Sequence, residues 1–224
     1  MRKKFTVILF ILINIGLCGC NDAPQPIMLK KQQYDFTNKY DTEKLKQLSE
    51  QSAKYGWYWL LYDKKPNLKL AAEYFNACWQ YDPDNYNAYW GWGVLRGEQA
   101  TGLMTKDSCE KLLLQSIEFL NLALQKNIPQ EEVPNLKMDL ANAYNGLGAF
   151  YYSNDSPEQA KQQLINGQKI LEEIINVFPD NGRAYFLSAV NAYYQNNIIK
   201  AKEYSAKAQD LEFPIDPNFL KELQ

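Results

Sequence analysis

Residues 144–151, YNGLGAFY, carry a tyrosine, a leucine, a glycine and a second tyrosine at spacings of three, one and three. On a helix of 3.6 residues per turn, these positions lie along one face. Nine residues later, Ala160 is followed at the fourth position by Leu164, again a small residue and then a large one. Two helices can approach closely where small residues meet, while large side chains fill the space around the contact. This stretch therefore predicts two tightly packed helices.

The same pattern recurs along the chain. Residues 180–186, DNGRAYF, echo residues 84–90, DNYNAYW. Small residues that favour close helix contact recur at Gly93, Gly148, Ala189, Ala71, Ala160 and Ala201, and large partners include Tyr62, Phe75, Tyr144 and Tyr151. One helical pair cannot bury its apolar face alone, whereas several stacked pairs form a continuous core. The recurrence therefore predicts an array of helical pairs.

Helix boundaries are indicated by clusters of proline and Asx residues. Asp41 or Thr42 can cap the first helix, with Glu43 in its first turn. The expected breaks are 64–66, 82–85, 97–107, 127–134, 153–157, 178–182 and 195–197. We interpret 82–85, DPDN, as a turn, because it lacks the glycine and the glutamate of a calcium loop. No alternating strand pattern bounded by tight-turn dipeptides is present, so we expect an all-α fold.

These motifs resemble the tetratricopeptide repeat, with Tyr144 in place of the usual tryptophan. The resemblance implies an α-α superhelix, a right-handed solenoid of about four helical hairpins. The expected repeats are 52–85, 86–128, 141–180 and 182–215, and the tail 217–224 is expected to cap the end. Two departures are an insertion of about eleven residues near 96–107 and a longer second helix in the third repeat.

The amino terminus predicts export from the cytoplasm. Residues 2–4 are basic, and residues 5–17, FTVILFILINIGL, form an apolar run. Thirteen residues are too few to span a bilayer, which requires about 20, but they suit the apolar region of a signal peptide.

Leu17-Cys18-Gly19-Cys20 resembles the lipobox of a bacterial lipoprotein precursor. The resemblance implies a signal peptide at 1–19, a lipidated Cys20 with a flexible tether over 20–40, and a helical domain over 41–224. It implies attachment to a membrane of the bacterial cell envelope, and Asn21 favours the outer membrane. An ordinary secretory signal with two chance cysteines is the alternative.

Composition excludes several classes of function. The chain has no histidine, which removes Ser-His-Asp and Cys-His nucleophile systems and HExxH zinc sites. We expect no enzyme activity, cofactor or metal. Loss of the three basic residues of the signal would leave 21 basic against 26 acidic residues, a net charge of −5. Nucleic acid is therefore an unlikely partner.

By the tetratricopeptide resemblance, partners lie in a concave groove lined by the first helix of each repeat. The implied residues are Asn87, Trp90 and Val94, then Asn142, Asn145 and Tyr152, then Arg183, Phe186 and Tyr193. Amides, aromatic rings and a cation suit a peptide segment of an envelope protein. The alternative for each residue is ordinary packing or solvation.

Three further questions stay open at this level. The aromatic stretch 55–62 is either an exposed patch or a buried helix, and burial is favoured because it is apolar on every side. Cys78 and Cys109 either pair or remain thiols. Besides the protein-binding scaffold, two rival functions remain. One is a small-ligand or glycan receptor, or an enzyme, using Glu98 and Lys106. The other is a structural homo-oligomer.

Overall fold

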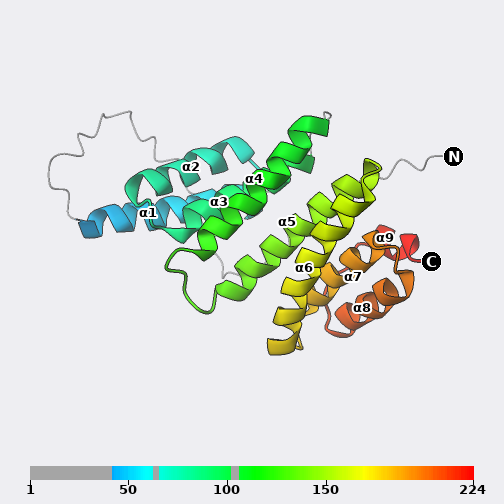
Figure 1. Ribbon diagram of the computed structural model, residues 1–224. Coiled ribbons are helices and arrows are strands. Elements are labelled where there is room, and N and C mark those ends of the chain that lie inside the picture. The colour runs from blue at the N-terminus through cyan, green and yellow to red at the C-terminus, as the bar shows by residue number, and fades with distance from the viewer. Residues whose placement is uncertain (1–41, 63–65, 102–105) are drawn as a thin grey trace.

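The computed structural model describes residues 42–62, 66–101 and 106–224 (Figure 1). This part of the chain is all helical, as predicted. Its elements are α1 (Thr42–Trp57), the π-helical segment η1 (Tyr58–Tyr62), α2 (Leu68–Tyr81), α3 (Tyr86–Thr101), α4 (Lys106–Leu124), α5 (Val133–Ser153), α6 (Pro157–Val177), α7 (Gly182–Tyr194), α8 (Ile198–Asp210) and α9 (Pro217–Glu222). The predicted signal peptide, Cys20 and the predicted tether lie outside the described residues.

The helices pack in adjacent pairs: α1 with α2, α3 with α4, α5 with α6 and α7 with α8. Figure 1 shows the pairs following one another from α1 and α2 at one end to α7, α8 and α9 at the other. The first helices also contact one another, α1 with α3, α3 with α5 and α5 with α7. We call α1, α3, α5 and α7 the first-helix row, and α2, α4, α6 and α8 the second-helix row.

Small residues bring the two helices of a pair together, as the sequence predicts. A Cβ at Gly93 would lie 2.6 Å from Leu120 Cγ, and one at Gly148 would lie 2.7 Å from Leu164 Cγ. In the first pair this position is Gly56, where a Cβ would lie 2.6 Å from Phe75 Cε1. The large side chain therefore comes from the second helix of these pairs, and it fills the space that the missing Cβ leaves.

Most helix ends lie where the Asx and proline clusters predict them. The side chains of Asn67, Asn181, Asn197 and Asp216 accept hydrogen bonds from backbone N–H groups in the first turns of α2, α7, α8 and α9. Proline occupies the first turn of α5, α6 and α9. Backbone N–H groups in the first turn have no carbonyl partner within the helix, so proline, which lacks this group, removes no hydrogen bond there.

Two expected boundaries are wrong. The break expected over 97–107 is shorter, because α3 continues to Thr101 and α4 starts at Lys106. Helix continues through Gly97, where even an added Cβ would meet only Ser116 Oγ, at the ordinary distance of 3.5 Å. The third pair begins at Val133 rather than near residue 141, while the longer second helix predicted for it is α6, with 21 residues.

The carboxyl-terminal helix α9 packs against the inner side of the last pair. Phe219 is buried, and its ring lies 5.6 Å from Phe186 and 5.8 Å from Tyr193. Leu223 is also buried in the same cluster. The tail thus covers apolar surface that α7 would otherwise expose, which is the arrangement expected of a cap. None of the described helices is long and apolar enough to cross a bilayer.

Candidate functional site

Three of the nine residues expected to contact a partner are buried. Trp90 is 8% exposed, Phe186 is 6% exposed and Asn145 is 1% exposed. They lie where neighbouring elements of the array meet, so their side chains fill or link these contacts. For these three residues the burial favours the alternative of ordinary packing, and a partner groove lined by the nine residues stays a prediction. Sequence spacing places them on the right helices, but it does not show what covers them.

Asn145 is part of a buried amide network between α5, α6 and α7. Its Nδ2 donates to the carbonyl oxygen of Leu187 at 3.0 Å, and its Oδ1 accepts from Asn191 Nδ2 at 2.5 Å. Asn191 Nδ2 also donates to the carbonyl oxygen of Leu164 at 2.8 Å. The network joins three helices and satisfies groups that burial would otherwise leave unpaired.

The other six predicted residues keep some exposure. Tyr152 is the most open at 45%. Asn87 already has a hydrogen-bond partner within the protein, because its Oδ1 accepts a 3.0 Å hydrogen bond from Trp57 Nε1. The remaining residues are partly buried and lie on the first-helix row: Val94, Asn142, Arg183 and Tyr193.

Asp139 is the polar centre of the first-helix row. Its Oδ2 accepts a 2.6 Å hydrogen bond from Trp90 Nε1, and its Oδ1 pairs with Arg183 Nη2. The three residues come from α5, α3 and α7 respectively, so one carboxylate ties three successive pairs together. The Arg183 and Asp139 side chains are 21% and 16% exposed, which leaves this ion pair at the edge of solvent. We call these three residues the Asp139 cluster.

Trp90 and Arg183 are among the predicted partner-binding residues, whereas Asp139 is not. The available signal was a lone carboxylate in the otherwise apolar run Met138-Asp139-Leu140-Ala141. A charged residue in such a run is rarely buried unless it is paired. That signal identifies a paired carboxylate without naming its partners.

Glu98 lies close enough to the Asp139 cluster to sense its charge. It belongs to α3 rather than to a loop, whereas Lys106 is exposed at the start of α4. Burial, and then repulsion by Asp139, raise the pKa of Glu98 to about 7. Near neutral pH this carboxyl is therefore partly protonated, in contrast to an ordinary glutamate.

We predict that Glu98→Gln stabilises the protein at pH 8 by about 1 kcal/mol and leaves its stability nearly unchanged at pH 4. Below the unfolded pKa, both states hold the proton, so Glu98 imposes no penalty. As pH rises from the ordinary value of 4.5 to the folded pKa of about 7, the unfolded state ionises while the folded state keeps the proton, so the wild type loses stability until the carboxyl is charged in both states. Urea unfolding at both pH values measures the difference. An equal effect at both values would contradict this assignment.

The aromatic stretch 55–62 is neither wholly buried nor wholly exposed. Leu60 is buried, and Trp57 packs edge-on against Phe75 and Trp90 at 5.2 and 5.3 Å. Tyr55, Tyr58 and Trp59 are only partly buried. The favoured interpretation as a buried helix therefore holds for one side of this stretch.

Both described cysteines are free, so the structure contains no disulfide between Cys78 and Cys109. Cys78 is buried, and its sulfur lies 3.2 Å from Ser49 Oγ. Burial raises the pKa of its thiol to about 11, which keeps it protonated and unreactive.

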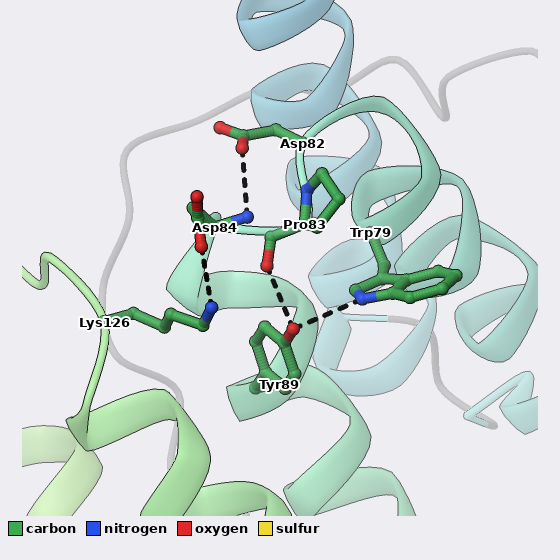
Figure 2. A network of polar contacts seen from close by, with 6 residues as sticks. All are labelled: Trp79, Asp82, Pro83, Asp84, Tyr89 and Lys126. Carbon is green, nitrogen blue, oxygen red and sulfur yellow. Dashed lines mark hydrogen bonds and ion pairs between the residues drawn. The ribbon is translucent and has the colours of Figure 1, made fainter.

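Side-chain hydrogen bonds and an ion pair hold the turn between α2 and α3 (Figure 2). Tyr89 Oη donates to the carbonyl oxygen of Pro83 at 2.9 Å and accepts from Trp79 Nε1 at 3.2 Å. Lys126 pairs with Asp84 at 2.7 Å and lies over the Tyr89 ring. In the described parts of the chain, no three histidine, cysteine or acidic side chains gather as a metal site would require.

Comparison with known proteins adds no relative. No protein-family model matches the chain, and no curated protein matches it.

Proposed function

We propose that this protein is a lipid-anchored scaffold of the bacterial cell envelope that captures a segment of another envelope protein. In this proposal, Cys20 carries the lipid and the helical pairs form a right-handed superhelical array of tetratricopeptide type. The lipid confines the array to a membrane and thereby raises its local concentration near partners. The lipoprotein resemblance favours the outer membrane, with the array facing the periplasm.

The observation that carries the proposal is the first-helix row with the Asp139 cluster inside it. Side chains from α3, α5 and α7 converge on a single carboxylate, so three pairs are held in fixed register. A surface fixed in this way loses little entropy when it binds an extended segment. On the same helix α5, Tyr152 near the carboxyl end offers an exposed ring, and Asn142 a partly exposed amide.

Affinity capture from membranes tests this function. The full precursor is compared with Cys20→Ala, and bound proteins are identified by mass spectrometry. We expect one reproducible envelope protein with the wild type and its loss with Cys20→Ala. Failure to find any specific partner for correctly lipidated protein would contradict the scaffold function.

A matched pair of surface variants locates the binding face. Tyr152 and Phe178 are both exposed aromatic residues, at 45% and 41%, but Tyr152 is on α5 of the first-helix row and Phe178 follows α6 of the second. We expect Tyr152→Ala to weaken capture of the partner about tenfold, as hot-spot rings do, and Phe178→Ala to leave it unchanged. The reverse pattern would place the interface on the second-helix row.

A further inference from the structure

The carboxyl-terminal helix α9 covers part of the surface that the sequence assigns to a partner. Both ring contacts of the buried Phe219 are with α7, because its ring centre lies 5.6 Å from that of Phe186 and 5.8 Å from that of Tyr193, each in an edge-on arrangement. Phe186 and Tyr193 are two of the three residues of α7 that are predicted to bind a partner. The tail of the chain itself therefore lies on this part of the predicted partner surface. We call the surface of α7 beneath Phe219 the tail site.

The contact of α9 with the tail site has the form of a short amphipathic helix that binds through one face. Phe219 and Leu223 are four positions apart, so they lie on the same face, and each is only 4% exposed. Lys221, between them in the sequence, is exposed. Asp216 caps the helix, since its Oδ1 accepts a 2.8 Å hydrogen bond from the Asn218 N–H. Helical segments that dock into a groove of another protein use anchors at this spacing.

The backbone of α9 makes no described hydrogen bond to the helical pairs. The Leu220 N–H donates to the carbonyl oxygen of Asp216, and the Gln224 N–H to that of Lys221, so both bonds stay inside the tail. A helix of six residues is too short to be stable by itself in water. The free energy gained by burying two apolar side chains is similar in size to the conformational entropy lost by ordering six residues. A competing segment can therefore replace α9 at little cost.

An acidic group of α9 belongs to the same contact. Burial, and then the negative charge of Glu222, raise the pKa of the Tyr193 hydroxyl. Tyr152 of α5 raises this pKa as well, so this exposed ring lies near the tail site. The Tyr152 ring also lies 6.3 Å from that of Tyr194 on α7. The exposed part of the predicted partner surface is thus continuous with the part that α9 covers.

We propose that the tail site binds a helical segment of the partner protein, and that α9 occupies the site until this segment displaces it. The segment carries an aromatic residue, an acidic residue three positions later and an aliphatic residue four positions later, as Phe219, Glu222 and Leu223 do in α9. This inference rests on the proposed scaffold function and names the kind of segment that the scaffold captures. A segment without the aromatic anchor would gain too little to replace α9.

Binding of a peptide to the full-length protein tests the inference. The probe is a fluorescent peptide with the sequence of residues 215–224, IDPNFLKELQ, and its anisotropy reports binding. In the wild type the tethered α9 competes at an effective concentration on the order of millimolar, so the peptide binds weakly. Phe219→Ala removes the anchor of the tail, and we expect it to tighten peptide binding at least about tenfold. Lys221→Ala, at an exposed position of the same helix, is the matched control and should bind as the wild type does.

Changes in the peptide identify the anchors. With the Phe219→Ala protein, a peptide that carries Phe219→Ala should bind at least about tenfold more weakly than the parent peptide. A peptide that carries Glu222→Gln should bind about threefold more weakly. Adding Tyr193→Phe to the protein should remove this second difference, because the two groups act on each other.

Hydrogen exchange of the wild type gives a readout that does not require the Phe219→Ala variant to fold. Saturating peptide should speed exchange of the amides of residues 218–224 at least about threefold, because it displaces α9. The amides of α8 should be unchanged. A tail that is only a fixed cap would exchange at the same rate with and without peptide, and this result would overturn the inference.

Two further results would overturn the inference. One is a folded Phe219→Ala protein, by circular dichroism, that binds the peptide no better than the wild type does. The other is a dimer in sedimentation that Phe219→Ala dissociates, which would assign α9 to self-association.

Capture from membranes separates this inference from the scaffold function. We expect Phe219→Ala to capture more of the partner than the wild type does. A partner that both proteins capture equally would overturn the inference alone. Absence of any specific partner for both proteins would contradict the scaffold function, and this inference with it.

Discussion

Gly91→Ala is expected to destabilise the protein by about 3 kcal/mol or more, although it adds only one methyl group. This is one of the two largest effects that we predict. A Cβ at this position would lie 2.1 Å from Phe75 Cε1 and 2.3 Å from its Cζ. Phe75 cannot retreat, because it is fully buried and a Cβ on Gly56 would likewise approach its ring to 2.6 Å. Because the ring is buried and in contact on both sides, we expect the loss in free energy of unfolding to lie at the upper end of the range for overpacked cores.

Urea unfolding followed by circular dichroism measures this effect, and Gly97→Ala is the control on the same helix. Its new Cβ would meet only Ser116 Oγ, at the ordinary distance of 3.5 Å. We expect Gly97→Ala to stabilise by about 0.5–1 kcal/mol through helix propensity. Phe75→Leu combined with Gly91→Ala should recover part of the loss. Equal effects of the two glycine substitutions would mean that Phe75 is not clamped between α1 and α3.

Asn145→Asp is expected to destabilise the protein by about 3 kcal/mol at pH 7. The substitution keeps the size of the side chain but replaces the amide N–H that donates to the Leu187 carbonyl oxygen. A carboxylate would face that carbonyl in a site that is 1% exposed. Two acceptors then oppose each other with no water to separate them, and a buried charge is added.

The loss should shrink as pH falls, and this distinguishes a charge effect from a packing effect. Burial raises the pKa of the introduced carboxyl above its unfolded value, so the penalty grows as pH rises from about 4. Unfolding measured from pH 4 to pH 8 tests the slope. Asn142→Asp, on the same helix but partly exposed, should change stability by less than about 0.5 kcal/mol. A pH-independent loss in Asn145→Asp would contradict the proposed cause.

Local signals in the sequence account for the helices and for the contacts within each pair. Asx residues cap α2, α7, α8 and α9 because their short side chains reach the first free N–H groups of a helix. Gly93 and Gly148 mark close contacts because a missing Cβ leaves room for a large residue on the paired helix. A cap acts within one helical turn, and the glycine contacts join helices that follow each other in the chain, so spacing alone reveals both.

Other features depend on residues far apart in the sequence. Asp139 meets Trp90 and Arg183 across 49 and 44 positions, and no local spacing relates the three. The position of Gly91 against Phe75 was also missed, since two helical pairs must meet before it becomes visible.

The sequence alone determined that this chain forms paired helices, where most of them end and which faces are apolar. Only the tertiary structure decided that Asn145 is buried, that the charge of Asp139 acts on Glu98, and that Asp139 joins Trp90 and Arg183. The physical reason is that periodicity specifies which face of a helix is apolar. Burial, charge and function depend on which other element comes to lie against that face.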